Sequence, residues 1–548
     1  MKTKLMWMVT LLAAMVTNSP ACTNLIVGKA ASADGSVIVS YSADSFGMFG
    51  HLYHSPAATH SQGEMLDIYD WDTAQYLGQI KQVPKTYNVI GNINEFQVTI
   101  GETTFGGRPE LADSTGIIDY GSLIYIALQR ASTAREAIQV MTDLVKEYGY
   151  HSEGESFTVA DPNEAWILEM IGKGPGVRGA VWVAVRIPDD CIAAHANQSR
   201  IHKFNMEDKE NCMYSPDVIS FAREKGYFNG VNKDFSFADA YNPLDFGGLR
   251  YCEARVWSFY RRHNTEMDKY LSYIKGETSE PMPLYIKPDK KVSVRDVQQD
   301  MRDHYEGTPL DMTKDLGAGA YNSPYRPSPL SFKVDGQDYF NERPISTQQS
   351  AFTFVSQMRG NLPNAIGGVL WFGMDDANMI AYTPVYCCAT EVPPCYTKEV
   401  ADGVTFSWNS AFWVCNWVSN MIYPRYGLMI DDLREVQKQA EDGFFAAQTE
   451  VEAKAMEMYK ESPAKAKEYL TGYTVQTAQN MLDGWKKLGE YLIVKYNDLV
   501  MKRTKDGKFE RTSTGLCAPV IRPGYPEEYN RKVIQETGNR YKVIDLKK

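Results

Sequence analysis

The chain has 548 residues, of which 44% are apolar and 12% aromatic, enough to bury a large core and to form more than one lobe. Its formal net charge is −11 and it has no basic cluster, which argues against nucleic acid as a partner. It also lacks low-complexity tracts and fixed-period repeats, so the composition predicts a globular protein and excludes a linker or a repeat array.

The N-terminus has the pattern of a removable signal peptide, residues 1–21. Two lysines precede a short apolar segment at 5–16, and Ser19 and Ala21 place small residues before the expected cut. The apolar segment is shorter than the roughly 20 residues that span a bilayer, and no later segment is long and apolar enough. We therefore expect an exported chain without an integral membrane segment, located in the periplasm, at the cell surface or outside the cell.

Removal of this leader makes Cys22 the new N-terminal residue. A terminal cysteine carries a thiol and a free α-amine, which supply a nucleophile and a general base without a separate histidine. The alternative is a lipoprotein, in which Cys22 is lipidated, although the preceding Ser19-Pro20-Ala21 fits a lipidation signal poorly. The two interpretations exclude each other, because lipidation caps the sulfur and usually the amine.

The first residues after the leader predict a β-hairpin. Two β-prone apolar runs, 22–27 and 37–40, flank an Asp-Gly turn at 34–35. A helix is expected at 122–148, where alanines and a methionine recur close to helical spacing. Further strands are expected at 97–104, 157–160, 165–170, 180–186 and 191–194. Strands flanked by helical stretches predict an α+β protein with layered sheets and helices outside.

The pattern changes after about residue 430. Leu433, Val436, Ala440 and Phe444 recur at three- and four-residue spacing, and a similar series runs over 475–492. Two or more long amphipathic helices packed against the core are expected. The predicted organisation is therefore a signal peptide at 1–21, a main domain at 22–430, a helical region at 431–502 and an irregular C-terminal extension at 503–548.

Eight cysteines remain besides Cys22, and an even number in an exported chain permits disulfides whose pairing the sequence does not reveal. Cys387, Cys388 and Cys395 lie close together and could form a local bridge or a metal site. No histidine stands at zinc-ligand spacing to them, so a metal is the weaker alternative and buried free thiols are the default. We expect no metal and no cofactor.

Several sequence strings, in the same order, resemble the C69 family of cysteine dipeptidases. They are Cys22–Lys29, Asp34–Val37, Ala43–Ser45, Asn94–Glu102, Trp166–Glu169, Trp182–Asp190, Ala196–Ile201 and Trp371–Asp376. The resemblance runs from Cys22 to about residue 430 and places the chain among the N-terminal nucleophile hydrolases. It implies a four-layer αββα sandwich, two antiparallel sheets between helical layers, with the helical region added at the C-terminus.

The same resemblance implies a mechanism. An α-amine has a pKa of about 7.7–8.0, so that of Cys22 can accept the thiol proton at neutral pH before the sulfur attacks an amide carbonyl. By matching positions, Asp44 would hold this amine and Asn197 would donate to the oxyanion. Arg255 would lie near the nucleophile, where a fixed cation lowers a thiol pKa. A thioester forms, and water then hydrolyses it.

Three further residues are candidates for substrate binding. Glu102 and Glu169 could each bind the free amine of a dipeptide, which requires a carboxylate. Many relatives have an arginine three residues before the equivalent of Asp44, whereas this chain has Tyr41. A phenol donates a hydrogen bond but brings no positive charge at neutral pH, so the exchange bears on thiolate stabilisation and specificity.

Three functions follow from these residues. The first is an exported dipeptidase that acts on dipeptides or short peptides through Cys22. The second is an acylase that cleaves N-acyl or bile-acid amides by the same chemistry, and the third is a lipidated or inactive surface binding protein. The expected partner is a peptide substrate, and the sequence leaves open whether the chain forms a homo-oligomer.

Overall fold

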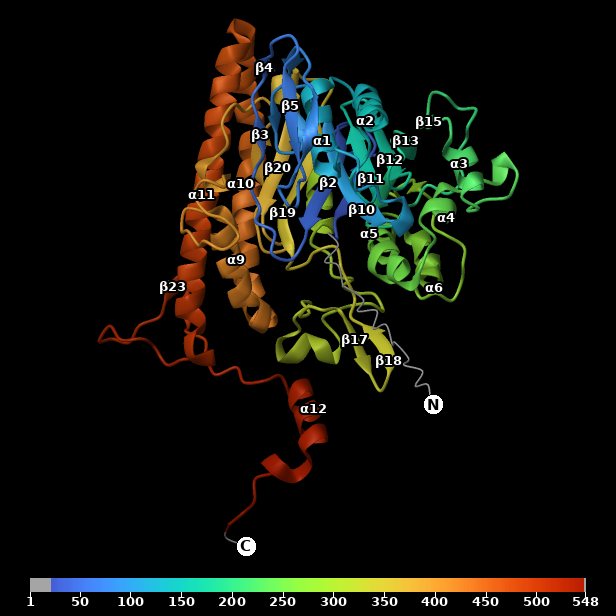
Figure 1. Cartoon of the computed structure of the whole chain (residues 1–548). Helices are drawn as coiled ribbons and strands as arrows, with labels where there is room; N and C mark the ends of the chain where they lie inside the picture. Colours follow the sequence, from blue (N-terminus) through green and yellow to red (C-terminus); the bar gives the residue numbers. More distant parts are fainter. Residues whose placement is uncertain (1–20, 547–548) are drawn as a thin grey trace, which may run out of the picture.

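The computed structural model describes residues 21–546. Two large sheets form the centre of the molecule, the helices α10 and α11 run along one side, and the C-terminal segment extends away from the body (Figure 1). The predicted signal peptide lies outside the described residues, apart from Ala21. Within residues 21–546, none of the helices combines the length and the apolar character needed to cross a membrane.

The first large sheet has seven antiparallel strands in the order β16-β14-β1-β2-β19-β20-β21. Its centre is the predicted hairpin, whose strands are buried along their whole length. Its strands are β1 (Thr23–Val27), β2 (Val37–Asp44), β14 (Ile192–His195), β16 (Tyr285–Ile286), β19 (Ser350–Met358), β20 (Gly368–Met374) and β21 (Thr383–Tyr386). Cys22 thus lies directly before the N-terminal end of a central strand.

The second large sheet has eight antiparallel strands in the order β15-β13-β12-β11-β10-β9-β8-β3. Its strands are β3 (His54–Ser55), β8 (Val89–Ile90), β9 (Ile93–Asn94), β10 (Thr99–Gly106), β11 (Gly154–Ala160), β12 (Ala165–Gly172), β13 (Ala180–Ile187) and β15 (Cys212–Tyr214). Small antiparallel pairs are β4 (Ala58–Thr59) with β7 (Lys85–Thr86), β5 (Met65–Tyr69) with β6 (Tyr76–Lys81), and β17 (Ser331–Val334) with β18 (Gln337–Phe340).

The two sheets pack face to face, because β10 of the second sheet contacts β1 and β2 of the first. Helices α1 and α2 lie on the second sheet, and α9 and α11 lie on the first. The α+β class, the antiparallel sheets and the C-terminal helical region are thereby confirmed. That these layers are the sandwich of the N-terminal nucleophile hydrolases stays a prediction, as do the domain boundaries.

The helix expected at 122–148 is two helices, α1 (Tyr120–Arg130) and α2 (Ala134–Tyr148). The break arises because the Thr133 side chain accepts a hydrogen bond from the Glu136 N–H, while the Glu136 carboxylate accepts from Ser132. This N-terminal cap starts a new helix at a point where the apolar spacing alone predicts continuation.

Helices α9 (Ala411–Ile422), α10 (Tyr426–Glu461) and α11 (Pro463–Tyr496) form the C-terminal helical region. Their buried apolar residues belong to the same core as the first sheet. Other helices are α3 (Val218–Glu224), α4 (Phe237–Tyr241), α5 (Ala254–His263), α6 (Leu271–Ile274), α7 (Val294–Asp300) and α8 (Asn364–Gly367).

The segment expected to be irregular contains a two-stranded hairpin, β22 (Thr504–Lys505) with β23 (Lys508–Phe509), and helix α12 (Glu527–Thr537). α12 buries none of its residues. Proline before its first turn, two glutamates within that turn and pairs of opposite charge four residues apart favour the helix locally. These signals are short-range and lack the apolar periodicity on which the sequence prediction relied.

Candidate active site

Cys22 precedes β1 in the middle of the seven-stranded sheet and is 1% exposed. Its thiol donates to Glu102 Oε1 at 3.3 Å, and its Sγ lies 3.6 Å from Tyr41 Oη. In the full-length chain the Ala21–Cys22 peptide bond is intact, and the Ala21 N–H donates to the Asp44 carbonyl over 2.7 Å. Burial, with the nearby Glu102 and Asp44 carboxylates, raises the pKa of the thiol well above its ordinary value. The thiol is therefore protonated at neutral pH when Cys22 is joined to Ala21.

Tyr41 and Glu102 connect the two sheets beside this thiol. Tyr41 lies on β2 opposite Asn24 of β1, and its Oη donates to Glu102 Oε1 of β10 over 2.5 Å. The Asn24 amide donates to the Glu102 carbonyl oxygen over 2.6 Å. Tyr41 therefore places a phenol next to Sγ, beside the Glu102 carboxyl group.

Glu155, which the sequence analysis did not identify, completes a carboxyl pair with Glu102. It lies on β11 opposite Thr104, whose hydroxyl donates to it over 2.6 Å. The Glu102 and Glu155 carboxyl groups are close enough to affect each other's pKa, and within residues 21–546 their Oε2 atoms have no hydrogen-bond partner. Burial raises the pKa of Glu102 to about 7 and, with the charge of Glu102, raises that of Glu155 well above its ordinary value. The pair therefore holds a proton at neutral pH.

Asp44 ends β2 and is fully buried. Its carboxylate accepts hydrogen bonds from Arg343 at 2.6 Å, from Ser350 at 2.6 Å and from Ser42 at 2.9 Å. Arg343 also donates to the carbonyl oxygen of Ala21, the residue before the expected cut. Arg343 was missed because it lies in an irregular segment without a periodic pattern or a recognisable motif.

Asn197 and Arg255 hydrogen-bond to each other near the Cys22 backbone. Arg255 lies on α5 and donates to the Cys22 carbonyl at 2.6 Å and to the Thr23 hydroxyl at 2.8 Å. It also donates to Asn197 Oδ1 at 2.9 Å, while Asn197 Nδ2 donates to the Thr104 carbonyl at 2.7 Å. Asn197 has φ of 62°, in the left-handed region that asparagine tolerates. Arg255 thus ties the start of β1 to the turn that follows β14.

Glu169 lies on β12 and is fully buried. Its carboxylate accepts hydrogen bonds from the Ser199 hydroxyl at 2.5 Å and from the backbone N–H groups of Arg200 at 2.6 Å and Ile201 at 3.2 Å. These bonds anchor the segment that follows Asn197. Its binding of a substrate amine stays a prediction, as does that of Glu102.

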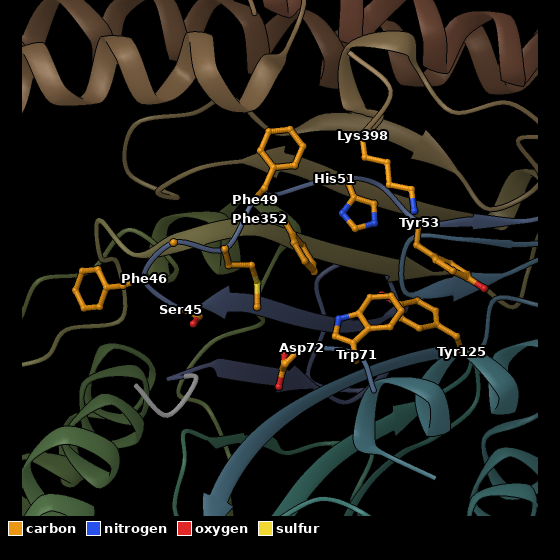
Figure 2. Close-up of a pocket in the computed structure, with 12 residues that line it drawn as sticks. Ser45, Phe46, Phe49, His51, Tyr53, Trp71, Asp72, Tyr125, Phe352 and Lys398 are labelled. Carbon is orange, nitrogen blue, oxygen red and sulfur yellow. The ribbon is translucent and has the colours of Figure 1, made fainter. Parts of the chain in front are cut away.

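A cavity of about 640 Å³ lies at the end of β2 (Figure 2). It begins at Ser45, directly after Asp44, and includes Phe352, whose ring centroid lies 5.7 Å from that of Tyr41. Asp72 also lines it, and its charge adds to burial in raising the pKa of Glu102. The cavity therefore borders the end of β2, the strand that carries Tyr41 and Asp44.

The model of peptidase family C69 matches this chain over residues 21–55 and 50–439. The chain belongs to peptidase family C69. The match covers the two large sheets, Cys22 and the residues around it, so the resemblance predicted from the sequence strings is confirmed. Membership makes the chain a peptide hydrolase.

Curated relatives agree with this assignment. A "Probable dipeptidase" of Salmonella dublin is 31% identical over 384 residues, 67% of this chain and 81% of that protein. A "Probable dipeptidase" of Latilactobacillus sakei is 26% identical over 427 residues, 74% and 82% of the two chains. A "Dipeptidase" of Bifidobacterium longum (strain NCC 2705) is 24% identical over 431 residues, 70% and 74% of the two chains.

The nine cysteines of this C69 peptidase all lie within residues 21–546, and all are free thiols. Cys387, Cys388 and Cys395 are therefore not bridged locally. They are buried in the apolar core, where the Cys387 thiol donates to the Asn364 carbonyl over 3.1 Å. Within residues 21–546 there is no group of three or more His, Cys, Asp or Glu side chains placed to bind a metal ion.

The carboxyl pair of this C69 peptidase predicts a pH-dependent stability. The pKa of Glu102 rises from 4.5 to about 7 on folding, so the folded protein binds the proton more tightly and loses this stabilisation as the pH rises from about 4.5 through 7. Glu102→Gln mimics the protonated form. We expect the variant to equal the wild type near pH 4.5 and to exceed its free energy of unfolding by about 1–3 kcal/mol at pH 8.

Urea denaturation of both proteins at the two pH values measures this difference. Glu468→Gln, on the exposed side of α11, is the control and should change stability by less than about 0.5 kcal/mol at either pH. A Glu102→Gln variant whose advantage is the same at pH 4.5 and 8 would show that the pair does not titrate in this range.

Proposed function

We propose that this C69 peptidase is an exported cysteine dipeptidase that hydrolyses dipeptides through a thioester on N-terminal Cys22. The observation that carries the proposal is the position of Cys22 directly before the N-terminal end of a central strand. Asp44 contacts the backbone of Ala21, and Arg255 contacts both the Cys22 carbonyl and Asn197. The names of the relatives support a dipeptide substrate.

Removal of residues 1–21 would convert the amide nitrogen of Cys22 into an α-amine, next to the present position of Ala21. Ala21 contacts the Asp44 carbonyl and Arg343, which is paired with the Asp44 carboxylate. The new amine would therefore form beside Asp44, which could orient it. It would also stand within one residue of the thiol, as a base that takes the thiol proton must.

In the proposed reaction the amine of Cys22 takes the thiol proton, and the sulfur attacks the carbonyl carbon of the peptide bond. The Asn197 amide donates to the oxyanion of the tetrahedral intermediate. The C–N bond then breaks, and the departing amino group takes the proton from the Cys22 ammonium. Water, deprotonated by the same amine, hydrolyses the thioester and restores the thiol. This sequence is that of an N-terminal nucleophile hydrolase, the fold we propose for the two stacked sheets.

Intact-mass analysis and N-terminal sequencing of the exported protein from its native host test the proposal. A chain that starts at unmodified Cys22 and releases amino acids from dipeptides supports it. A retained leader or a lipidated cysteine contradicts the mechanism and favours a surface binding protein. Release of fatty acids from N-acyl amino acids, without dipeptide hydrolysis, would instead identify an acylase.

Asn197 provides a separate test of the oxyanion role. Loss of one oxyanion donor lowers kcat by about 10²–10³-fold, so we expect this loss in both Asn197→Gly and Asn197→Ala, with a small change in KM. Glycine adopts the left-handed conformation at Asn197 readily, whereas alanine adds a backbone cost of about 1–2 kcal/mol. Steady-state kinetics and urea denaturation separate the effects. A glycine variant with wild-type kcat would rule out the oxyanion role.

A further inference from the structure

The cavity at the end of β2 is lined by one acidic residue, Asp72, by the basic residues His51 and Lys398, and by several aromatic ones. Trp71, Tyr53 and Tyr125 pack together, with ring centroids 4.0 Å apart for Tyr53–Tyr125 and 4.5 Å apart for Trp71–Tyr125. Figure 2 shows Trp71 and Tyr125 side by side, with Asp72 next to Trp71 and nearer to Ser45. The carboxylate therefore lies between the aromatic wall, formed by Trp71, Tyr53 and Tyr125, and the end of β2.

The loop that carries Asp72 is held in place. The Trp71 N–H donates to the Asp119 carboxylate over 3.0 Å, and the Thr73 N–H donates to Asp70 over 2.8 Å. The Tyr120 hydroxyl donates to Asp72 Oδ1 over 2.9 Å. Asp72 itself is exposed. These contacts fix the position of its carboxylate and leave it open to the cavity.

The other carboxylates near the thiol are occupied by the protein. Glu102 Oε1 accepts from Cys22 and Tyr41, and both Glu102 and its neighbour Glu155 are fully buried. Glu169 accepts from the segment that follows Asn197. Glu102 and Glu169 would each have to give up several internal hydrogen bonds to bind a substrate. Asp72 accepts a side-chain hydrogen bond from Tyr120 alone among the contacts described, so it is the acidic side chain most accessible to a substrate.

The chemistry of a dipeptide matches this arrangement. The Cα of its first residue is bonded to the carbonyl carbon that Cys22 attacks, and the same Cα carries the α-ammonium group and the side chain. Both groups must therefore enter the space next to the sulfur. A carboxylate beside aromatic faces suits an ammonium group and an apolar side chain.

We propose that Asp72 binds the α-ammonium group of the substrate and that the aromatic wall of Trp71, Tyr53 and Tyr125 binds an apolar side chain on its first residue. The inference rests on the proposed function and specifies its substrate class. The enzyme would prefer dipeptides with a free amino group and a large apolar or aromatic first residue. Amides that lack the ammonium group would be poor substrates.

The test compares phenylalanyl-alanine with 3-phenylpropionyl-alanine, which has the same amide and ring but no amino group. Asp72→Asn should lower kcat/KM for phenylalanyl-alanine by about 10–100-fold, mainly through KM, because a charged hydrogen bond is lost. It should leave the rate with 3-phenylpropionyl-alanine unchanged or raised. Asp67→Asn, an equal charge change at an exposed position on β5, is the control and should alter neither substrate by more than about twofold.

The aromatic wall is tested with glycyl-alanine as the reference. Trp71→Leu keeps the backbone hydrogen bond to Asp119 but removes ring surface, so the preference for phenylalanyl-alanine over glycyl-alanine should fall by about tenfold. Equal losses of rate for the charged and uncharged substrates in Asp72→Asn, or no loss, would overturn the role of Asp72. An unchanged preference in Trp71→Leu would overturn the role of the wall.

Failure of the proposed function gives a different result. If the wild type hydrolyses no dipeptide, or if its activity survives Cys22→Ala, the dipeptidase mechanism is wrong. If hydrolysis depends on Cys22 but Asp72→Asn does not distinguish the two substrates, only the assignment of the ammonium site is wrong.

Discussion

Cys22→Ala is expected to abolish hydrolysis in the mature protein, lowering kcat by about 10⁶-fold, the loss seen when a catalytic nucleophile is removed. No neighbouring side chain can replace it, because the contacts of the sulfur are the acid Glu102 and the phenol Tyr41. Cys22→Ser should retain more activity than Cys22→Ala, since a hydroxyl can accept the same role as a weaker nucleophile.

Cys191→Ala is the matched control for this experiment. Cys191 is also a buried free thiol, 3% exposed, but it lies outside the site, so its loss should change kcat by less than about threefold. Each variant is prepared with residue 22 at its N-terminus, confirmed by mass, so that a defect in leader removal is not counted as a defect in catalysis. Activity of Cys22→Ala near the wild-type level would contradict the mechanism.

Arg343→Met is expected to cost about 3–5 kcal/mol of folding free energy, the largest effect on stability that we predict. Arg343 and Asp44 are 4% and 0% exposed and are joined over 2.6 Å. Removal of the guanidinium leaves the buried Asp44 carboxylate with two hydroxyl donors and no directly paired cationic side chain. The double variant Arg343→Met with Asp44→Asn should recover part of the loss, since it removes the unpaired charge.

Urea denaturation measures these free energies, and Lys465→Met is the control. Lys465 pairs with Glu461 one turn away on the surface, where both side chains are more than 60% exposed, so the change should cost less than about 0.5 kcal/mol. Equal stability of Arg343→Met and Lys465→Met would show that the buried ion pair does not stabilise the fold.

Local patterns accounted for much of the fold. The hairpin that begins after Cys22 could be predicted because β-prone runs flank an Asp-Gly turn, and α10 and α11 could be predicted from their long apolar periodicity. The break between α1 and α2 could not, because a hydrogen bond from Glu136 N–H to the Thr133 side chain outweighs an apolar spacing that continues across it.

The sequence by itself determined the family, the candidate nucleophile and the polar residues that match the family strings, because these reside in short continuous segments. The tertiary structure alone decided which groups surround the sulfur. Arg343 reaches Asp44 across almost 300 positions of the chain, while Glu155 meets Glu102 because β10 and β11 are paired. Asp72 reaches the site through the packing of its loop on α1. Burial then sets the charge of these groups, and burial depends on contacts that no local segment contains.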